Sequence, residues 1–434
     1  MPSLPYRLPL IGSILVAACT AQALSQARLG SWLFFAMAAV MAACQIAALV
    51  ATKNVRPTRR LLLVAFLFAA ACRVPLTLAP VNFDSDMIRY IWDGRVQRLG
   101  YNPYGLIPSD PALAHTHDAD TVRMPSRHVR TPYPPAAQLF FRTVVSISES
   151  PLFMKTVFTL CDLVTILILW RWLAVSGRNE WLALTYAWNP LVILEVALSS
   201  HLDALGAMCI VAAAYLLSRR RTALASVAFT LAVATKLLPI VLAPLFLGRV
   251  RPRDIALGLG LLGALYLPFM FGASLPVGAV PSVVAHIRFN SPVFRPLAWV
   301  ITPVGAALVA LLVGLGAAAW ARMRLDADNP AAWAWPMALA LACAPVIYPW
   351  YLLYFTPFLF TRATLPLAVW TYAVIPVYVV WERSLSGAEW RVPAGLMAVE
   401  YGLVVAAIAA VALWRTDGTP SRDASLVTTA TPTG

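Results

Sequence analysis

Long apolar runs, separated by short basic or proline-containing breaks, make up most of this chain. Runs of about 17–22 apolar residues are long enough for a helix to cross a bilayer. The pattern therefore predicts an all-α polytopic membrane protein with about 12–14 transmembrane helices. We expect spans at residues 8–25, 29–51, 60–78, 152–174, 181–198, 201–217, 222–235, 237–248, 254–272, 297–320, 331–347, 349–361, 364–380 and 394–414.

The composition agrees with this class. Of the 434 residues, 60% are hydrophobic and 12% are charged, whereas about 25% are charged in a soluble globular chain. The formal net charge of +14 would suit a nucleic-acid partner, but Lys and Arg lie mainly between the spans. This placement follows the positive-inside rule, so we predict a bilayer as partner and no nucleic acid.

The basic residues also predict the orientation of the chain. Taken in order, the basic loops alternate onto one side, which the positive-inside rule identifies as the cytoplasm, together with both termini. The residues that carry this prediction are Lys53, Arg56, Arg59, Arg60, Arg171, Arg178, Arg219, Arg220, Arg221, Arg249, Arg251, Arg253, Arg322 and Arg324. We therefore expect a multi-pass protein of the cell (inner) membrane.

The unusual polar motifs all fall on the opposite, extracytoplasmic side. A random scatter would not place them on one face, so we expect a functional site there. These motifs are the long loop 79–151, the segments 199–203, 286–292 and 348–351, and the corner at Thr235 and Lys236.

The most highly charged of these motifs lies at the start of the long loop. A helix that begins near Ser85 would place Asp86, Arg89, Tyr90 and Asp93 on one face, which we expect to be exposed to water. Asp86 is a candidate general base, and pairing with Arg89 is the alternative. Asp93, before a glycine, is better explained as structural.

Asp84 has two explanations that can coexist. It is a good N-cap for a helix that begins at Ser85, and it is also a second candidate base. The tail after residue 415 is rich in Thr, Ser, Asp and Pro and is predicted to be disordered.

Two further motifs carry ionisable side chains on the same side. Lys236 lies in an apolar stretch that Pro239 breaks, so we expect it at the outer interface, facing a carboxylate or a phosphate. Snorkelling towards headgroups is the alternative. His201 and Asp203 begin a span, either as a solvent-facing helix start or as a second polar wall of the site. A divalent metal held by acidic residues and His201 stays open as a minor alternative, although we expect no metal or other cofactor.

The last outer motifs are basic and aromatic. Arg288 suits a phosphate or sugar contact, with a plain solvated loop as the alternative. Tyr348, Trp350 and Tyr351 suit stacking on a sugar ring, with an interfacial aromatic belt as the alternative.

Several of these motifs together resemble those of the GT-C glycosyltransferases, multi-pass enzymes that use polyprenyl-phosphate sugars, and most of all the bacterial mannosyltransferase-like group that includes family 87. The resemblance covers roughly residues 60–360. It rests on Asp86-x-x-Arg89-Tyr90-x-Trp92-Asp93-Gly94, Gly100-x-Asn102-Pro103-Tyr104, Tyr133-Pro134-Pro135, His201-x-Asp203, Lys236-x-x-Pro239 and Pro349-Trp350-Tyr351. One departure is that related loops often read Ser-Asp-Asp, where this chain has Asp84-Ser85-Asp86.

The resemblance implies a GT-C-like bundle with interfacial helices in the first large extracytoplasmic loop. Its parts would be two N-terminal helices at 1–58, a catalytic domain at 59–415 and a cytoplasmic tail at 416–434. The implied activity is inverting transfer of a sugar, with mannose favoured, from a polyprenyl-phosphate donor. The acceptor would be a hydroxyl of a glycolipid or envelope polysaccharide.

The resemblance also implies a role for each candidate residue. Asp86, or in second place Asp84, would be the catalytic base. Lys236, Arg288 and His201 would bind the donor phosphate. The remaining substrate contacts would come from Arg89, Tyr90, Tyr133, Asp203, Tyr348, Trp350 and Tyr351. The competing hypotheses are a transporter or lipid flippase that uses the same charged face, and an accessory subunit that keeps the fold without the activity.

Overall fold

The computed structural model describes residues 4–81, 86–270 and 276–416. Within these ranges every regular element is helical and no strand forms, which confirms the all-α class. Seven helices are long and apolar enough to cross a bilayer, and the bent pair Glu180–Ala187 and Pro190–Leu198 makes an eighth if it counts as one span. The protein is therefore a polytopic membrane protein.

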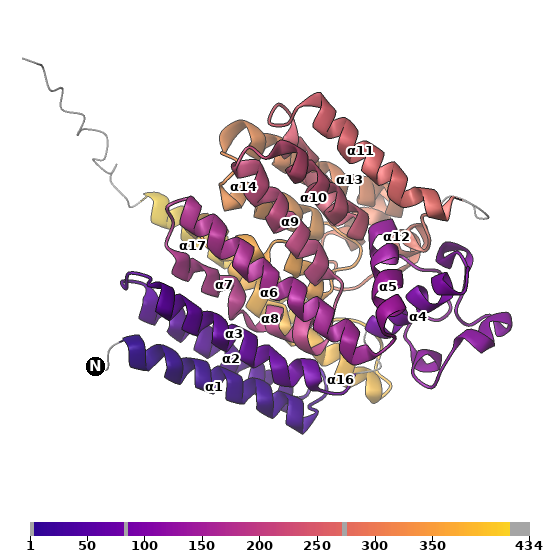
Figure 1. The fold of residues 1–434 in the computed structure, drawn as a ribbon, viewed down its shortest axis with the longest axis horizontal. Helices are drawn as coiled ribbons and strands as arrows, with labels where there is room; N and C mark the ends of the chain where they lie inside the picture. Colours follow the sequence, from indigo (N-terminus) through magenta and orange to yellow (C-terminus); the bar gives the residue numbers. More distant parts are fainter. Residues whose placement is uncertain (1–3, 82–85, 271–275, 417–434) are drawn as a thin grey trace, which may run out of the picture.

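The long spans match predicted ones closely. Those formed by a continuous α-helix are α1 (Leu4–Ser25), α2 (Trp32–Thr52), α3 (Arg59–Leu78), α6 (Pro151–Val175) and α17 (Ala394–Thr416). The span α13 (Phe294–Arg324) is kinked at Ile301 and Thr302, where the backbone is not helical. Another, Arg362–Leu385, is made of α15 (Leu365–Ala373) and α16 (Val379–Leu385) with short 3-10 turns. Figure 1 shows α1, α2 and α3 side by side along one flank of the bundle.

The other predicted spans form shorter helices, and only the bounds of α10 agree fully with the prediction. They form α9 (Asp203–Ser218), α10 (Thr222–Thr235), α11 (Pro252–Tyr266) and α14 (Pro330–Ala342). Two segments predicted to span, 237–248 and 349–361, are wrong as α-helices because their prolines favour 3-10 turns, Leu238–Phe246 and Pro349–Tyr354. At about 2 Å per residue these turns are too short to cross a bilayer alone.

A buried ion pair joins two of the spans. Arg73 of α3 pairs with Asp162 of α6, and neither side chain is exposed to solvent. Arg73 also donates to the carbonyls of Ala69 at 2.7 Å and Ala187 at 3.0 Å. Charged groups inside a membrane protein persist when they are paired in this way.

The long loop forms two helices that cap one end of the bundle, α4 (Met87–Arg98) and α5 (Pro135–Ile147) (Figure 1). They pack closely because α4 carries Gly94. A Cβ at this position would lie 2.7 Å from the carbonyl oxygen of Phe141 in α5. α5 thus packs directly on α4.

The predicted water-facing side of α4 is wrong for three of its four residues. Arg89, Tyr90 and Asp93 have exposed fractions of only 4%, 1% and 0%, because α5, α6 and the rest of the loop cover the helix. Asp86 alone, at the N-terminal end of α4, is half-buried. Asp84 lies outside the described residues.

A polar anchor fixes the middle of the long loop to α4. Asp118 lies 2.5 Å from Arg95, and its carboxylate also accepts hydrogen bonds from the backbone and hydroxyl of Thr121 at 2.8 and 2.9 Å. Partial burial works against the charged form, but these hydrogen bonds outweigh it and lower the pKa of Asp118 to about 2.

Candidate active site

The predicted outer motifs meet at the end of the bundle that α4 and α5 cap. Lys236, the residue after α10, reaches Asp203 at the first turn of α9, with its Nζ atom 2.6 Å from the carboxylate. The same Nζ atom lies 3.7 Å from the centre of the Tyr351 ring. Three separate segments therefore converge on one ammonium group. We call Lys236, Asp203 and Tyr351 the lysine cluster.

The lysine cluster is open on one side. Lys236 keeps 21% of its side chain exposed, whereas Asp203 keeps 1%. The second carboxylate oxygen of Asp203 is buried and has no hydrogen-bond partner among the described residues. A cation held by one buried carboxylate and an aromatic face, with one side open to solvent, can bind a further anion.

His201 lies beside the lysine cluster in a stack of rings. Its imidazole lies on the indole of Trp350, with centroids 3.9 Å apart and planes 8° from parallel. Tyr348 stacks on Trp350 at 4.4 Å and 6°. The His201 Nδ1 atom lies 2.6 Å from the carboxylate of Glu195. His201 is therefore a buried, oriented ring and not the solvent-facing helix start that was its alternative.

The turn that delivers His201 is strained. Ser200 has a φ of +60°, a conformation that non-glycine residues rarely adopt. Just before it, Leu194–Leu198 form a π-helical turn, a feature frequent at functional sites. This turn brings the backbone N–H of His201 to the carbonyl of Glu195 at 3.0 Å, and so places both side chains on the same side.

Asp86 contributes negative charge to this end of the molecule. Its side chain does not cap α4. Burial, and after it the charge of Asp86, raises the pKa of Tyr133 well above its usual value. The same two causes raise the pKa of Tyr348 to about 12. Asp86 therefore acts electrostatically on both the α4–α5 side and the Trp350 side of the site.

The other predicted residues of α4 lie deeper. Arg89 pairs with Asp93 at 2.7 Å and donates to the carbonyl of Val129 at 3.1 Å. Asp93 also accepts a hydrogen bond from Gln138 of α5 at 2.8 Å. This agrees with a structural role for Asp93 and places Arg89 in the same interhelical network.

Two tyrosines link α4 to the His201 turn. The Tyr90 ring meets that of Tyr133 edge to face at 5.1 Å. The Tyr90 hydroxyl accepts a hydrogen bond from the backbone of Leu202 at 3.4 Å. These contacts hold α4 against the segment that carries His201 and Asp203.

Arg288 points to its own segment. Its guanidinium donates to the carbonyls of Val284 at 3.0 Å and Ile287 at 2.7 Å, and it lies over the ring of Phe294 at 4.7 Å. With several of its donors already used, Arg288 is less available to a donor phosphate than Lys236.

The support for the aromatic stack was not predicted from the sequence. Phe289 and Val346 form a parallel bridge that fixes the segment before Tyr348. The next residue, Asn290, donates to the carboxylate of Glu400 in α17 at 3.0 Å. An acid inside an apolar span was the available signal for Glu400, because such a group needs a polar partner.

No group of three or more His, Cys, Asp or Glu side chains in the described ranges is arranged to hold a metal ion.

A comparison with protein families decides the identity. The model of the MptA/B family, described as the N-terminal domain of alpha-(1->6)-mannopyranosyltransferases, matches residues 4–250. The chain belongs to this family. It is a mannosyltransferase of the GT-C, family 87-like type. The search found no match among curated proteins or solved structures.

The family match and the motif resemblance cover different parts of the chain. It begins at residue 4, so this mannosyltransferase includes α1 and α2 in its family domain, whereas the motif resemblance began near residue 60. It ends at residue 250, so the match covers Asp86, His201, Asp203 and Lys236 but not Trp350 or Tyr351.

Proposed function

We propose that this mannosyltransferase takes mannose from a polyprenyl-phosphate donor and transfers it, with inversion, to a hydroxyl of a glycolipid or envelope polysaccharide. The observation that carries the proposal is the lysine cluster, in which the Lys236 ammonium lies beside Asp203 and the lysine side chain stays 21% exposed, at the end of the bundle where Asp86 lies. A cation and a carboxylate on one surface match the two needs of the reaction, which are a stabilised leaving phosphate and a base.

In the proposed reaction, Asp86 accepts the proton of the acceptor hydroxyl as its oxygen attacks the anomeric carbon. Asp84 is the second candidate for this role. The bond from the anomeric carbon to the phosphate oxygen breaks, and polyprenyl phosphate leaves with the bonding electrons. Lys236 stabilises the charge that develops on that phosphate.

The other cluster residues would position the substrates. Asp203 orients Lys236, and Tyr348, Trp350 and Tyr351 offer ring faces for the sugar or the lipid. Tyr90, Tyr133 and Arg89 would hold the base side of the site in place. His201, whose Nδ1 atom lies beside Glu195, would contact the donor phosphate through its second ring nitrogen. Arg288 would serve as an outer phosphate contact. No cofactor enters this scheme.

The stereochemistry follows from a single displacement. A β-linked donor would give an α-linked product, and the α-(1→6) linkage in the family description fits this outcome. The arginine-rich loops at the other end of the bundle support an orientation with both termini in the cytoplasm and the active site on the outer face of the inner membrane.

The test uses the full chain in liposomes with polyprenyl-phosphate mannose. The unmodified enzyme should release one polyprenyl phosphate for each mannose transferred. The Asp86→Asn variant should lose at least about 100-fold in kcat. Asp84→Asn is measured in parallel to assign the base, and Asp120→Asn, an exposed aspartate of the same loop, is the matched control.

Each part of the proposal can fail separately. Near-normal turnover in both Asp86→Asn and Asp84→Asn would overturn the assignment of the base. Activity with a nucleotide sugar and none with the lipid donor would overturn the donor. Retention of the β configuration, read by NMR of the product, would overturn the single displacement. Movement of lipid without formation of a glycosidic bond would favour the flippase alternative.

A further inference from the structure

A second polar site lies at the opposite end of the bundle. A pocket of about 650 Å³ opens between the loops that follow α6, α9, the Leu238–Phe246 turn and α13. It is separated from the lysine cluster by the length of α9, which runs from Asp203 to Ser218. The mannose-transfer chemistry does not use it.

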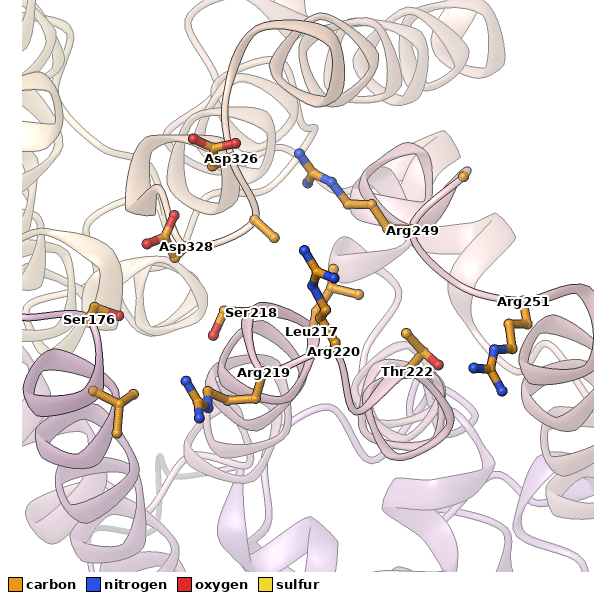
Figure 2. Close-up of a pocket in the computed structure, with 13 residues that line it drawn as sticks. Ser176, Leu217, Ser218, Arg219, Arg220, Thr222, Arg249, Arg251, Asp326 and Asp328 are labelled. Carbon is orange, nitrogen blue, oxygen red and sulfur yellow. The ribbon is translucent and has the colours of Figure 1, made fainter. Parts of the chain in front are cut away.

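Figure 2 shows four arginines and two aspartates around this pocket, which leaves an excess of two positive charges. We call Arg219, Arg220, Arg249 and Arg251 the arginine pocket; the carboxylates of Asp326 and Asp328 lie across from them. Of the residues that the structure describes, these six form no ion pair with one another within 4.0 Å. The guanidinium groups are therefore not engaged by close ion pairs within the pocket.

Arg249 is held by one hydrogen bond and has a second, unpaired guanidinium nitrogen. Its Nη2 atom donates to the carbonyl of Leu325 at 2.6 Å. Its Nη1 atom is buried and finds no acceptor among the described residues. Burial, followed by the nearby charge of Arg322, lowers the pKa of Arg249. An acceptor in the pocket would satisfy this donor.

The turn after α9 is shaped to present two arginines. The backbone N–H groups of Arg220 and Arg221 bond back to Leu217 at 3.0 Å and Leu216 at 2.9 Å, which closes the helix. This closure requires a left-handed residue, and Arg220 adopts a φ of +56° where glycine is usual. In Figure 2 the Arg220 guanidinium points into the pocket, towards the side of Asp326 and Arg249.

We propose that the arginine pocket binds the phosphate group of an anionic ligand. Guanidinium groups from separate loops give the forked donors that phosphate oxygens accept. Val175 and Leu217 add apolar lining where α6 and α9 end, so a phospholipid headgroup can enter from the bilayer edge. A soluble phosphate is the other source of the same chemistry.

The experiment compares two double variants of the full chain in a neutral detergent. Arg219→Gln with Arg220→Gln removes two pocket charges, and neither side chain forms an ion pair with the residues that the structure describes. Arg59→Gln with Arg60→Gln removes two exposed charges at the start of α3, at the same end of the bundle and outside the pocket. Native mass spectrometry measures binding of phosphatidylglycerol, with phosphatidylcholine as the uncharged reference and inorganic phosphate as competitor.

The pocket variant should bind phosphatidylglycerol about tenfold more weakly than the unmodified protein, and the α3 variant should bind it equally well. If inorganic phosphate at millimolar concentration displaces the lipid, the ligand of the pocket is a soluble phosphate. If inorganic phosphate does not displace the lipid, the ligand is the phospholipid headgroup. An equal loss of lipid affinity in both variants would show that general surface charge explains the binding, and would overturn the proposal. Unchanged binding in the pocket variant would also overturn it.

Discussion

The ammonium nitrogen of Lys236 lies 2.6 Å from the Asp203 carboxylate, and the two residues come from the C-terminal end of α10 and the first turn of α9. If Lys236 stabilises a leaving phosphate, Lys236→Met should lower kcat by about 10²–10³-fold, the range seen when one transition-state donor is removed. Asp203→Asn should cost less, because the ammonium remains and only its orientation is lost. Lys53→Met, which changes an exposed lysine at the other end of the bundle, should retain full activity. Wild-type turnover in Lys236→Met would contradict the assignment.

The stack of His201, Trp350 and Tyr348 makes a second prediction. Trp350→Ala should remove both ring contacts and leave a cavity, with a loss of about 3–5 kcal/mol in stability. Trp350→Phe should keep part of the stack and most of the stability. A loss of mannose transfer in this variant would therefore report a change at the site and not unfolding. Trp299→Ala, at a side chain that is 80% exposed, should change neither property. Thermal unfolding and mannose transfer are measured together, and an unaltered melting temperature in Trp350→Ala would argue against the stack.

The packing of α4 on α5 can be tested with two glycines. A methyl group at Gly94 would meet the Phe141 carbonyl oxygen at 2.7 Å, whereas nothing lies within 4 Å of a methyl group at Gly105. Gly94→Ala should therefore cost about 1–3 kcal/mol by overpacking, and Gly105→Ala should be neutral. Thermal unfolding in detergent measures both variants. Equal stabilities would show that the two helices separate at low cost.

The Asp118 anchor predicts a dependence on pH. Its pKa is about 2 in the folded loop, below the value of about 3.9 in an unfolded chain. The stabilisation is therefore complete above about pH 4 and is lost as the pH falls towards 2. Pepsin, which is active in this range, should cleave residues 108–130 more slowly in the unmodified protein than in Asp118→Asn at pH 4. The two rates should converge near pH 2, and a constant ratio across the range would contradict the prediction.

Sequence patterns were sufficient for the class of fold and for the meeting of the outer motifs. Lys236 was expected to face a carboxylate or a phosphate because an interfacial lysine next to a helix break needs a counter-charge, and in the structure it faces the carboxylate of Asp203. The burial of Arg89 and Asp93 could not be predicted, because the i, i+4 spacing shows only that two residues share a face. Whether water or α5 covers that face depends on packing between segments about 45 residues apart.

Proline-rich apolar segments were the other source of error. The stretches around Pro244 and Pro349 have the composition of a span, but their prolines leave backbone carbonyls without partners and favour 3-10 turns. The proximity of Glu195 to His201 depends on a π-helical turn that no simple periodicity reveals.

The contact between His201 and Trp350 joins a residue within the family match to one well beyond its end. A chimera that exchanges the C-terminal part of the chain at residue 250 for that of another mannosyltransferase would therefore pair this imidazole with a foreign surface. Such hybrids should insert into the membrane and keep the Lys236–Asp203 pair. Only those that bring a flat aromatic ring to the place of Trp350 should restore the stack on His201.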